Sequence, residues 1–132
     1  MGMGFEQLLQ SIMDSDVNIR HSIVADIKGK IITVNHRSGV TKYLSEEETA
    51  SSLVRAASAW KARKQLSPKI GMGKYAVAVF EKITRITFPL GANNLLFVSM
   101  GSEIIRRDLQ EGGQQQIVEH VLNILDGDPT TE

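Results

Sequence analysis

The segment Gly71-Met72-Gly73-Lys74 has the residue types of a phosphate-binding loop. In such a loop a glycine stands five residues before the Gly-Lys pair, and Ser or Thr follows the lysine to bind Mg²⁺. Here Pro68 and Tyr75 occupy those two positions, and Ala76 stands where a dinucleotide-binding loop needs its third glycine. The sequence therefore favours an ordinary connection between a helix and a strand, and we expect no nucleotide hydrolysis by this chain.

Asp14, Asp16 and Asn18 have the spacing that opens a calcium-binding loop. That loop also needs glycine at its sixth position and glutamate at its twelfth, where this chain has Ile19 and Ala25. A turn at the end of a helix is therefore the better interpretation.

The three histidines, His21, His36 and His120, have no metal-ligand spacing. His21 falls on the apolar face of a predicted strand, which favours a hydrogen-bonded, partly buried histidine over a ligand or base. The sequence does not exclude a serine–histidine–acid triad, because such triads form from residues that are distant in the sequence. However, it has no G-x-S-x-G elbow. Without cysteine, thiolate metal sites and cysteine nucleophiles are excluded. We predict no enzyme activity, no metal and no cofactor.

A basic cluster without an intervening acid is formed by Lys61, Arg63, Lys64, Lys69 and Lys74. One interpretation is a patch that binds an anion or an acidic partner. The other, favoured for the first three, is compensation of a helix dipole beside a solvated loop. Nucleic acid is disfavoured, because few aromatic residues lie near the cluster and 15 basic residues balance 15 acidic ones.

The composition predicts one ordinary domain. The 132 residues are 42% hydrophobic and 23% charged, which is typical of globular proteins. No apolar run approaches the roughly 20 residues of a membrane span, and no signal-peptide pattern opens the chain. We expect a cytoplasmic protein without membrane association, with a domain over residues 1–126 and a frayed polar tail over 127–132.

Apolar periodicity predicts eight elements in the order α-β-β-α-β-β-β-α. They are helix 5–13, strands 19–27 and 30–36, helix 45–66, strands 75–80, 83–90 and 95–100, and helix 117–125. Ser45 and Glu48 match a capping box at the start of the long helix, and Pro68 predicts its end near Leu66. Its buried stripe is predicted to be Leu53, Ala56, Ala57 and Trp60.

This order, the hairpin IVADIKGKII, the long capped helix and the segment RITFPLGANNLLFVS resemble the roadblock superfamily. This is a profilin-like group related to longin domains, and the likeness is to a prokaryotic or archaeal type. The resemblance covers nearly the whole chain. It implies an α/β (α+β) fold whose five-stranded antiparallel sheet has the middle helix on one face and the terminal helices on the other. The stretch GSEIIRRDLQEGGQQQ departs from a simple connection, so the geometry of residues 102–116 does not follow from the sequence.

The third predicted strand lacks any charge or proline, and an exposed edge of that kind promotes aggregation. Either a neighbour covers it or a second copy pairs with it. The resemblance places this strand at the sheet edge and implies homodimers, so the predicted interface is Tyr75, Ala76, Val77, Ala78, Val79 and Phe80, with Ala56 and Trp60 on the helix. In the alternative, Trp60 and the helix alanines pack on their own sheet.

Two hypotheses for function follow. The resemblance implies a non-enzymatic homodimeric scaffold or regulator that serves small Ras-like GTPases or a larger protein assembly. The alternative is a small-ligand sensory domain of profilin-like or PAS-like architecture, which needs a pocket between the sheet and a helix lined by polar groups such as His21 or Arg20.

Overall fold

The computed structural model describes residues 4–102 and 113–127. Its helices are α1 (Phe5–Ser15), α2 (Glu46–Lys64), α3 (Ser67–Ile70) and α5 (Gly113–Gly127), and its strands are β1 (Ile19–Asp26), β2 (Ile31–His36), β3 (Ala76–Val79), β4 (Ile83–Leu90) and β5 (Asn94–Gly101). The predicted order is confirmed, with the short α3 added. Most of the stretch 102–116 and the tail residues 128–132 lie outside the described residues, and Gly127, where the tail was expected to begin, is the last residue of α5.

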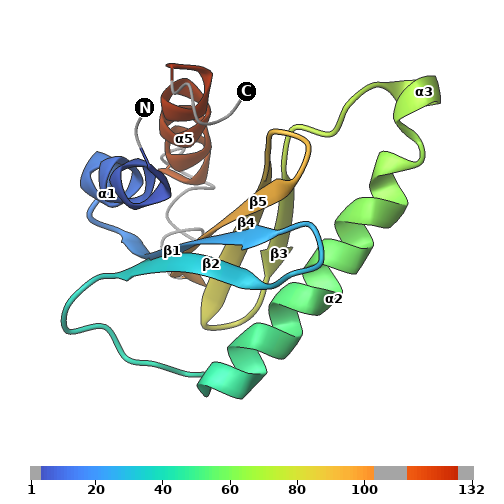
Figure 1. Cartoon of the computed structure of the whole chain (residues 1–132). Helices are drawn as coiled ribbons and strands as arrows, with labels where there is room; N and C mark the ends of the chain where they lie inside the picture. The colour runs from blue at the N-terminus through green and yellow to red at the C-terminus, as the bar shows by residue number, and fades with distance from the viewer. Residues whose placement is uncertain (1–3, 103–112, 128–132) are drawn as a thin grey trace.

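The five strands form one antiparallel sheet in the order β2-β1-β5-β4-β3. Helix α2 crosses one face of this sheet, and α1 and α5 lie together on the other face (Figure 1). The predicted fold class and the division of the helices between the two faces are therefore confirmed. Strands β2 and β3 form the two edges of the sheet.

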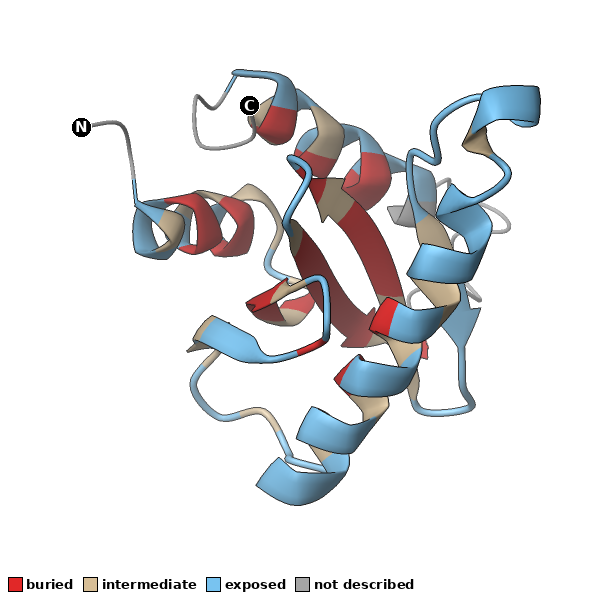
Figure 2. Cartoon of the chain, turned by 45° about the vertical axis from the view of Figure 1, so that its right-hand side comes forward, coloured by how far each residue is buried: buried red, intermediate tan, exposed pale blue. Residues whose placement is uncertain are grey.

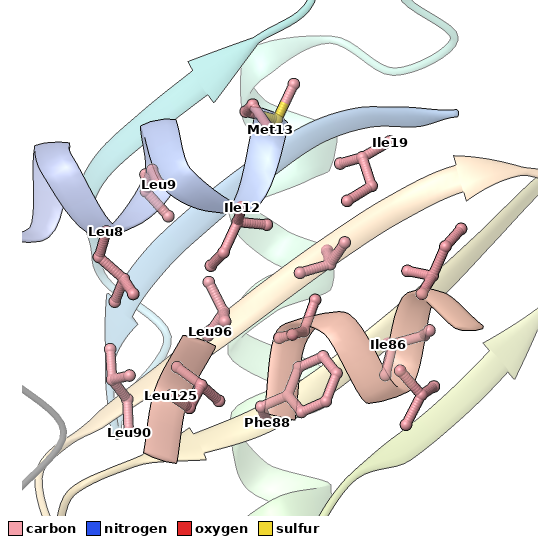
Figure 3. Packing of buried hydrophobic residues seen from close by; sticks show 14 of the residues in the cluster. Leu8, Leu9, Ile12, Met13, Ile19, Ile86, Phe88, Leu90, Leu96 and Leu125 are labelled. Atoms are coloured by element: carbon pink, nitrogen blue, oxygen red, sulfur yellow. The ribbon is translucent and has the colours of Figure 1, made fainter. Parts of the chain in front are cut away.

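The larger hydrophobic core lies between the sheet and the α1–α5 layer (Figure 3). Leu8 and Ile12 of α1 meet Phe88 of β4 and Leu96 of β5 there, all fully buried. Burying one such side chain contributes about 1.5–3 kcal/mol. The core under α2 is smaller, and within that helix only Leu53 and Ala57 are buried, so most of its surface is exposed (Figure 2).

One expectation for β1 was wrong. The period of two predicts that Ile19, His21, Ile23, Ala25 and Ile27 share a face, but Ile19 packs in the α1–α5 core while Ile23 and Ala25 pack under α2. The pairing with β5 shifts register between Ile19 and His21, and such a shift moves the side chains to the opposite face. Ile27 lies in the hairpin turn and is 48% exposed.

The predicted capping box of α2 is confirmed. The Glu48 backbone N–H donates to the Ser45 hydroxyl at 3.1 Å, and the Ser45 N–H donates to the Glu48 carboxylate at 2.9 Å. The helix ends at Lys64, two residues before the prediction. Pro68 lies in the first turn of α3, where its missing N–H costs no helical hydrogen bond.

The β1–β2 hairpin packs its turn directly against α2. The Asp26 carboxylate accepts hydrogen bonds of 2.9 Å from the backbone N–H groups of Lys28 and Lys30. Gly29 has a φ of 91°, and a Cβ at this position would lie 2.6 Å from the Cα of Val54. Only glycine allows both this conformation and this approach of the hairpin to the helix.

Candidate functional site

Strand β3 is the exposed apolar edge that the sequence predicts. Its register with β4 pairs Val77 with Ile86 and Val79 with Thr84, so both valines point toward the α1–α5 side of the sheet. Val77 is 36% exposed, Val79 58% and the following Phe80 63%. In the described part of the chain β3 pairs with β4 alone, which leaves the backbone groups along its outer side free for another strand.

The other predicted interface residues are partly used inside the chain. The Tyr75 ring lies 6.1 Å, centroid to centroid, from the ring of Phe88. Ala56 and Trp60 pack against the core under α2 and are half-buried. This packing corresponds to the alternative in which the helix stripe contacts its own sheet, so the exposed part of the predicted interface is mainly β3 from Val77 onward.

The predicted interface also includes α2, whose surface is largely exposed. Ala50 and Ala62 are exposed, as the expectation of a small-sided helix surface requires. Val54 is also exposed, although its backbone receives the hairpin turn. These residues leave room for another element to approach α2 closely.

The basic cluster divides into two parts. Lys61, Arg63 and Lys64 line a cavity of about 520 Å³ at the C-terminal end of α2, whereas Lys69 and Lys74 do not. Lys28 joins the cavity from the β1–β2 hairpin. Lys28 could not be assigned to this cluster from the sequence, because nothing there indicates that its turn lies near the end of α2.

The walls of this cavity come from α2, the sheet and the connection to β3. Ala57 and Trp60 contribute from α2, Leu95 from β5, and Met72 and Gly73 from the connection. A Cβ at Gly73 would lie 3.3 Å from the edge of the Trp60 indole, so the connection passes close to that ring. The glycine-rich segment therefore forms a wall of a cavity.

His21 is a hydrogen-bonded, partly buried histidine, as predicted. Its Nδ1 lies 3.0 Å from the Ser99 hydroxyl, and its ring centroid lies 5.6 Å from that of His36. Burial lowers the pKa of His21 to about 4, and positive charge on His36, Arg85 and Arg20 acts in the same direction. Ser99 is only 1% exposed, so its hydroxyl is inaccessible to a substrate.

Arg85 brings a cationic group into the region between the sheet and α2. It donates a hydrogen bond of 3.0 Å to the Ser52 hydroxyl, and its guanidinium lies 6.0 Å from the centroid of the Phe97 ring. Burial lowers the pKa of Arg85. These contacts anchor the N-terminal half of α2 to the sheet.

The interpretation of Asp14, Asp16 and Asn18 as a helix-end turn is confirmed. The Asp16 carboxylate accepts a hydrogen bond of 2.8 Å from the backbone N–H of Asn18. Among the residues described, no three potential ligands gather to hold a metal ion. Over the same residues, no helix has the length and apolar character needed to cross a membrane.

No protein-family model matches this chain, and no curated protein matches it. Solved structures do. The Roadblock/LC7 domain from Streptomyces avermitilis has a TM-score of 0.66 at 10% identity, with 91% of this chain and 90% of that chain covered.

Two structures of MglB are also similar. The gliding protein MglB from Thermus thermophilus has a TM-score of 0.62, and MglB in a tetrameric arrangement has one of 0.63. Each is 15% identical to this chain, with 92% of this chain and 87% of that chain covered. At these identities the likeness concerns the fold alone. The chain has the roadblock fold.

Proposed function

We propose that this chain is a non-enzymatic homodimeric scaffold or regulator, and that two copies associate through β3 and α2. The observation that carries the proposal is the exposed apolar edge of β3. Pairing of this strand with its copy across a two-fold axis would extend the sheet and cover the apolar side chains.

The other edge of the sheet is less suited to this role. Strand β2 also exposes Ile31, Ile32 and Val34, but the polar residues Thr33 and Asn35 interrupt this apolar surface. The Asn35 side chain also donates a hydrogen bond of 3.2 Å to Gln10 of α1. By contrast, charged residues only flank the apolar run of β3, so pairing through β3 desolvates fewer polar groups.

The proposed partner is a small Ras-like GTPase, as the roadblock resemblance implies. MglB, a protein of the same fold, occurs in a tetrameric arrangement, which supports assembly through this fold. We expect the GTPase to contact a sheet or helix surface without receiving a catalytic residue, and we expect no GTP or ATP hydrolysis by this chain alone. A candidate GTPase that binds in neither nucleotide state would count against the partnership.

The sensory alternative is not supported at the place where it was expected. His21 contacts Ser99, the Arg20 guanidinium donates to the Thr41 carbonyl at 2.5 Å, and neither residue lines the cavity. Any ligand site between the sheet and α2 therefore has to use other residues.

The test is a pair of charge substitutions at the two edges. Val77→Lys places a charge in the apolar run of β3, and Val34→Lys places the same charge on β2, where the native side chain is similarly exposed. We expect Val77→Lys to weaken the dimer at least tenfold in Kd, since it buries an unpaired charge at the interface, and Val34→Lys to leave the dimer intact.

Light scattering distinguishes the outcomes. A dimer that survives Val77→Lys and Val77→Pro but dissociates with Val34→Lys would place the interface at β2. A dimer that is unaffected by all three substitutions would place the interface at the terminal helices.

A further inference from the structure

We propose that the cavity at the end of α2 binds a small organic anion with a flat apolar body, of the class of aromatic carboxylates. The cavity shares Tyr75 and Trp60 with the predicted interface, whereas its four cations lie outside that interface. Its volume of about 520 Å³ lies within the range of about 300–1,000 Å³ that is usual for small-molecule sites.

The charge of the cavity determines the sign of the ligand. Four cations, Lys28, Lys61, Arg63 and Lys64, line it, and no Asp or Glu is among the described residues that do so. The nearest acid in sequence to Lys28, Asp26, uses its carboxylate to hold the hairpin turn. A cation would therefore be repelled, and an anion would find several partners.

Compensation of the helix dipole does not explain this arrangement by itself. Lys61, Arg63 and Lys64 stand in the last turn of α2, where cations stabilise the negative helix end. Lys28 belongs to a different element, and the close contact between Gly29 and Val54 brings its hairpin to α2. Cations from two elements thus border one cavity.

The apolar walls determine the body of the ligand. Trp60, Ala57 and Leu95 belong to the core under α2 and also line the cavity, and Met72 lines it from the connection to β3. The half-buried indole offers a flat face on which an aromatic ring can stack. Tyr75 also lines the cavity, but its ring is placed beside Phe88, so Trp60 is the aromatic group available to the ligand.

The probe for the test is 8-anilinonaphthalene-1-sulfonate, an aromatic anion that fluoresces in apolar surroundings. We expect one molecule to bind per chain and to quench Trp60, the only tryptophan. The double variant Lys61→Gln/Arg63→Gln should lower the affinity about tenfold, because each partly exposed ion pair contributes up to a factor of about five. Gly73→Leu should abolish binding, because its side chain would meet the indole.

The matched control is Lys69→Gln/Lys74→Gln, which removes the same charge from residues outside the cavity. It should bind the probe as wild type does. The neutral probe N-phenyl-1-naphthylamine should bind wild type and the Lys61/Arg63 variant equally.

Three results would overturn the proposal: equal loss of affinity in the two double variants, no binding to wild type, or loss of probe binding in step with dimerisation. The last result would mean that the second copy occupies the cavity. Because the proposal does not rest on the dimer, a wild-type monomer that binds the probe as described supports it while contradicting the proposed function.

Discussion

At the scale of single residues, His21 is the titratable side chain that the fold perturbs most clearly. Its ring lies against Ser99 of β5 and His36 of β2, and burial, together with the nearby Arg85 and Arg20, disfavours the charged form. The structure therefore holds His21 neutral at pH 7 as a hydrogen-bonding partner of Ser99. This role matches what its place in the sequence predicts.

The lowered pKa of His21 makes the stability of the fold depend on pH. Its pKa falls from 6.5 to about 4 on folding, so the unfolded chain takes up this proton first as pH decreases. The contribution of neutral His21 to the free energy of unfolding is complete above pH 6.5 and is lost between about pH 6.5 and 4. Over this range the free energy of unfolding falls by up to about 1.4 kcal/mol per pH unit.

Urea unfolding across this range measures the effect. Relative to wild type, His21→Asn should show a shallower fall in the free energy of unfolding, whereas the exposed His120→Asn should follow wild type. Parallel curves for wild type and His21→Asn would show that His21 titrates alike in the folded and unfolded chain.

At the scale of the elements, Gly29 tests how the hairpin is joined to α2. Gly29→Ala combines a left-handed φ with a Cβ placed against the Val54 backbone, and should lower the free energy of unfolding by about 3 kcal/mol. Gly39→Ala has a similar φ of 81° but open space around its Cβ, and should cost only about 1–2 kcal/mol. Comparing the urea unfolding of the two variants isolates the contact between the hairpin turn and α2. Equal losses in the free energy of unfolding would show that this contact does not constrain position 29.

Periodicity predicted most of the fold, because the residues that define each pattern are those that the helical layers bury. Thr84, Ile86, Phe88 and Leu90 alternate in the sequence and are all buried in β4. The reversed face of Ile19 was not predictable, because it depends on a register shift against a strand far along the chain. Pro68 was interpreted only as the end of a helix, although proline also suits the first turn of the next one.

A candidate site could be predicted from the sequence only where a single stretch of consecutive residues forms it. The apolar run of β3 is such a stretch, whereas its position at the sheet edge was implied by the roadblock resemblance. The cavity is not formed by one stretch, since Lys28, Trp60, Met72 and Leu95 come from four separate segments that meet only after folding. The sequence therefore predicted the cations of α2 without the cavity that they border.

At the scale of the whole molecule, the helices cover the two faces of the sheet to different extents. Helices α1 and α5 close one face over a large core, while α2 buries few of its residues on the other. The exposed side of α2 and the free edge at β3 are therefore the surfaces on which a second copy could bury more apolar area. In a dimer that associates through these two surfaces, the exposed side of α2 and the edge of β3 would be buried.

Sedimentation equilibrium of the wild-type protein, from low to high micromolar concentration, tests the proposed homodimer most directly. We expect a reversible species of twice the mass of the chain that predominates at the upper end of this range. A single species with the mass of one chain at high micromolar concentration would contradict it, because the exposed β3 edge would then remain unpaired in solution.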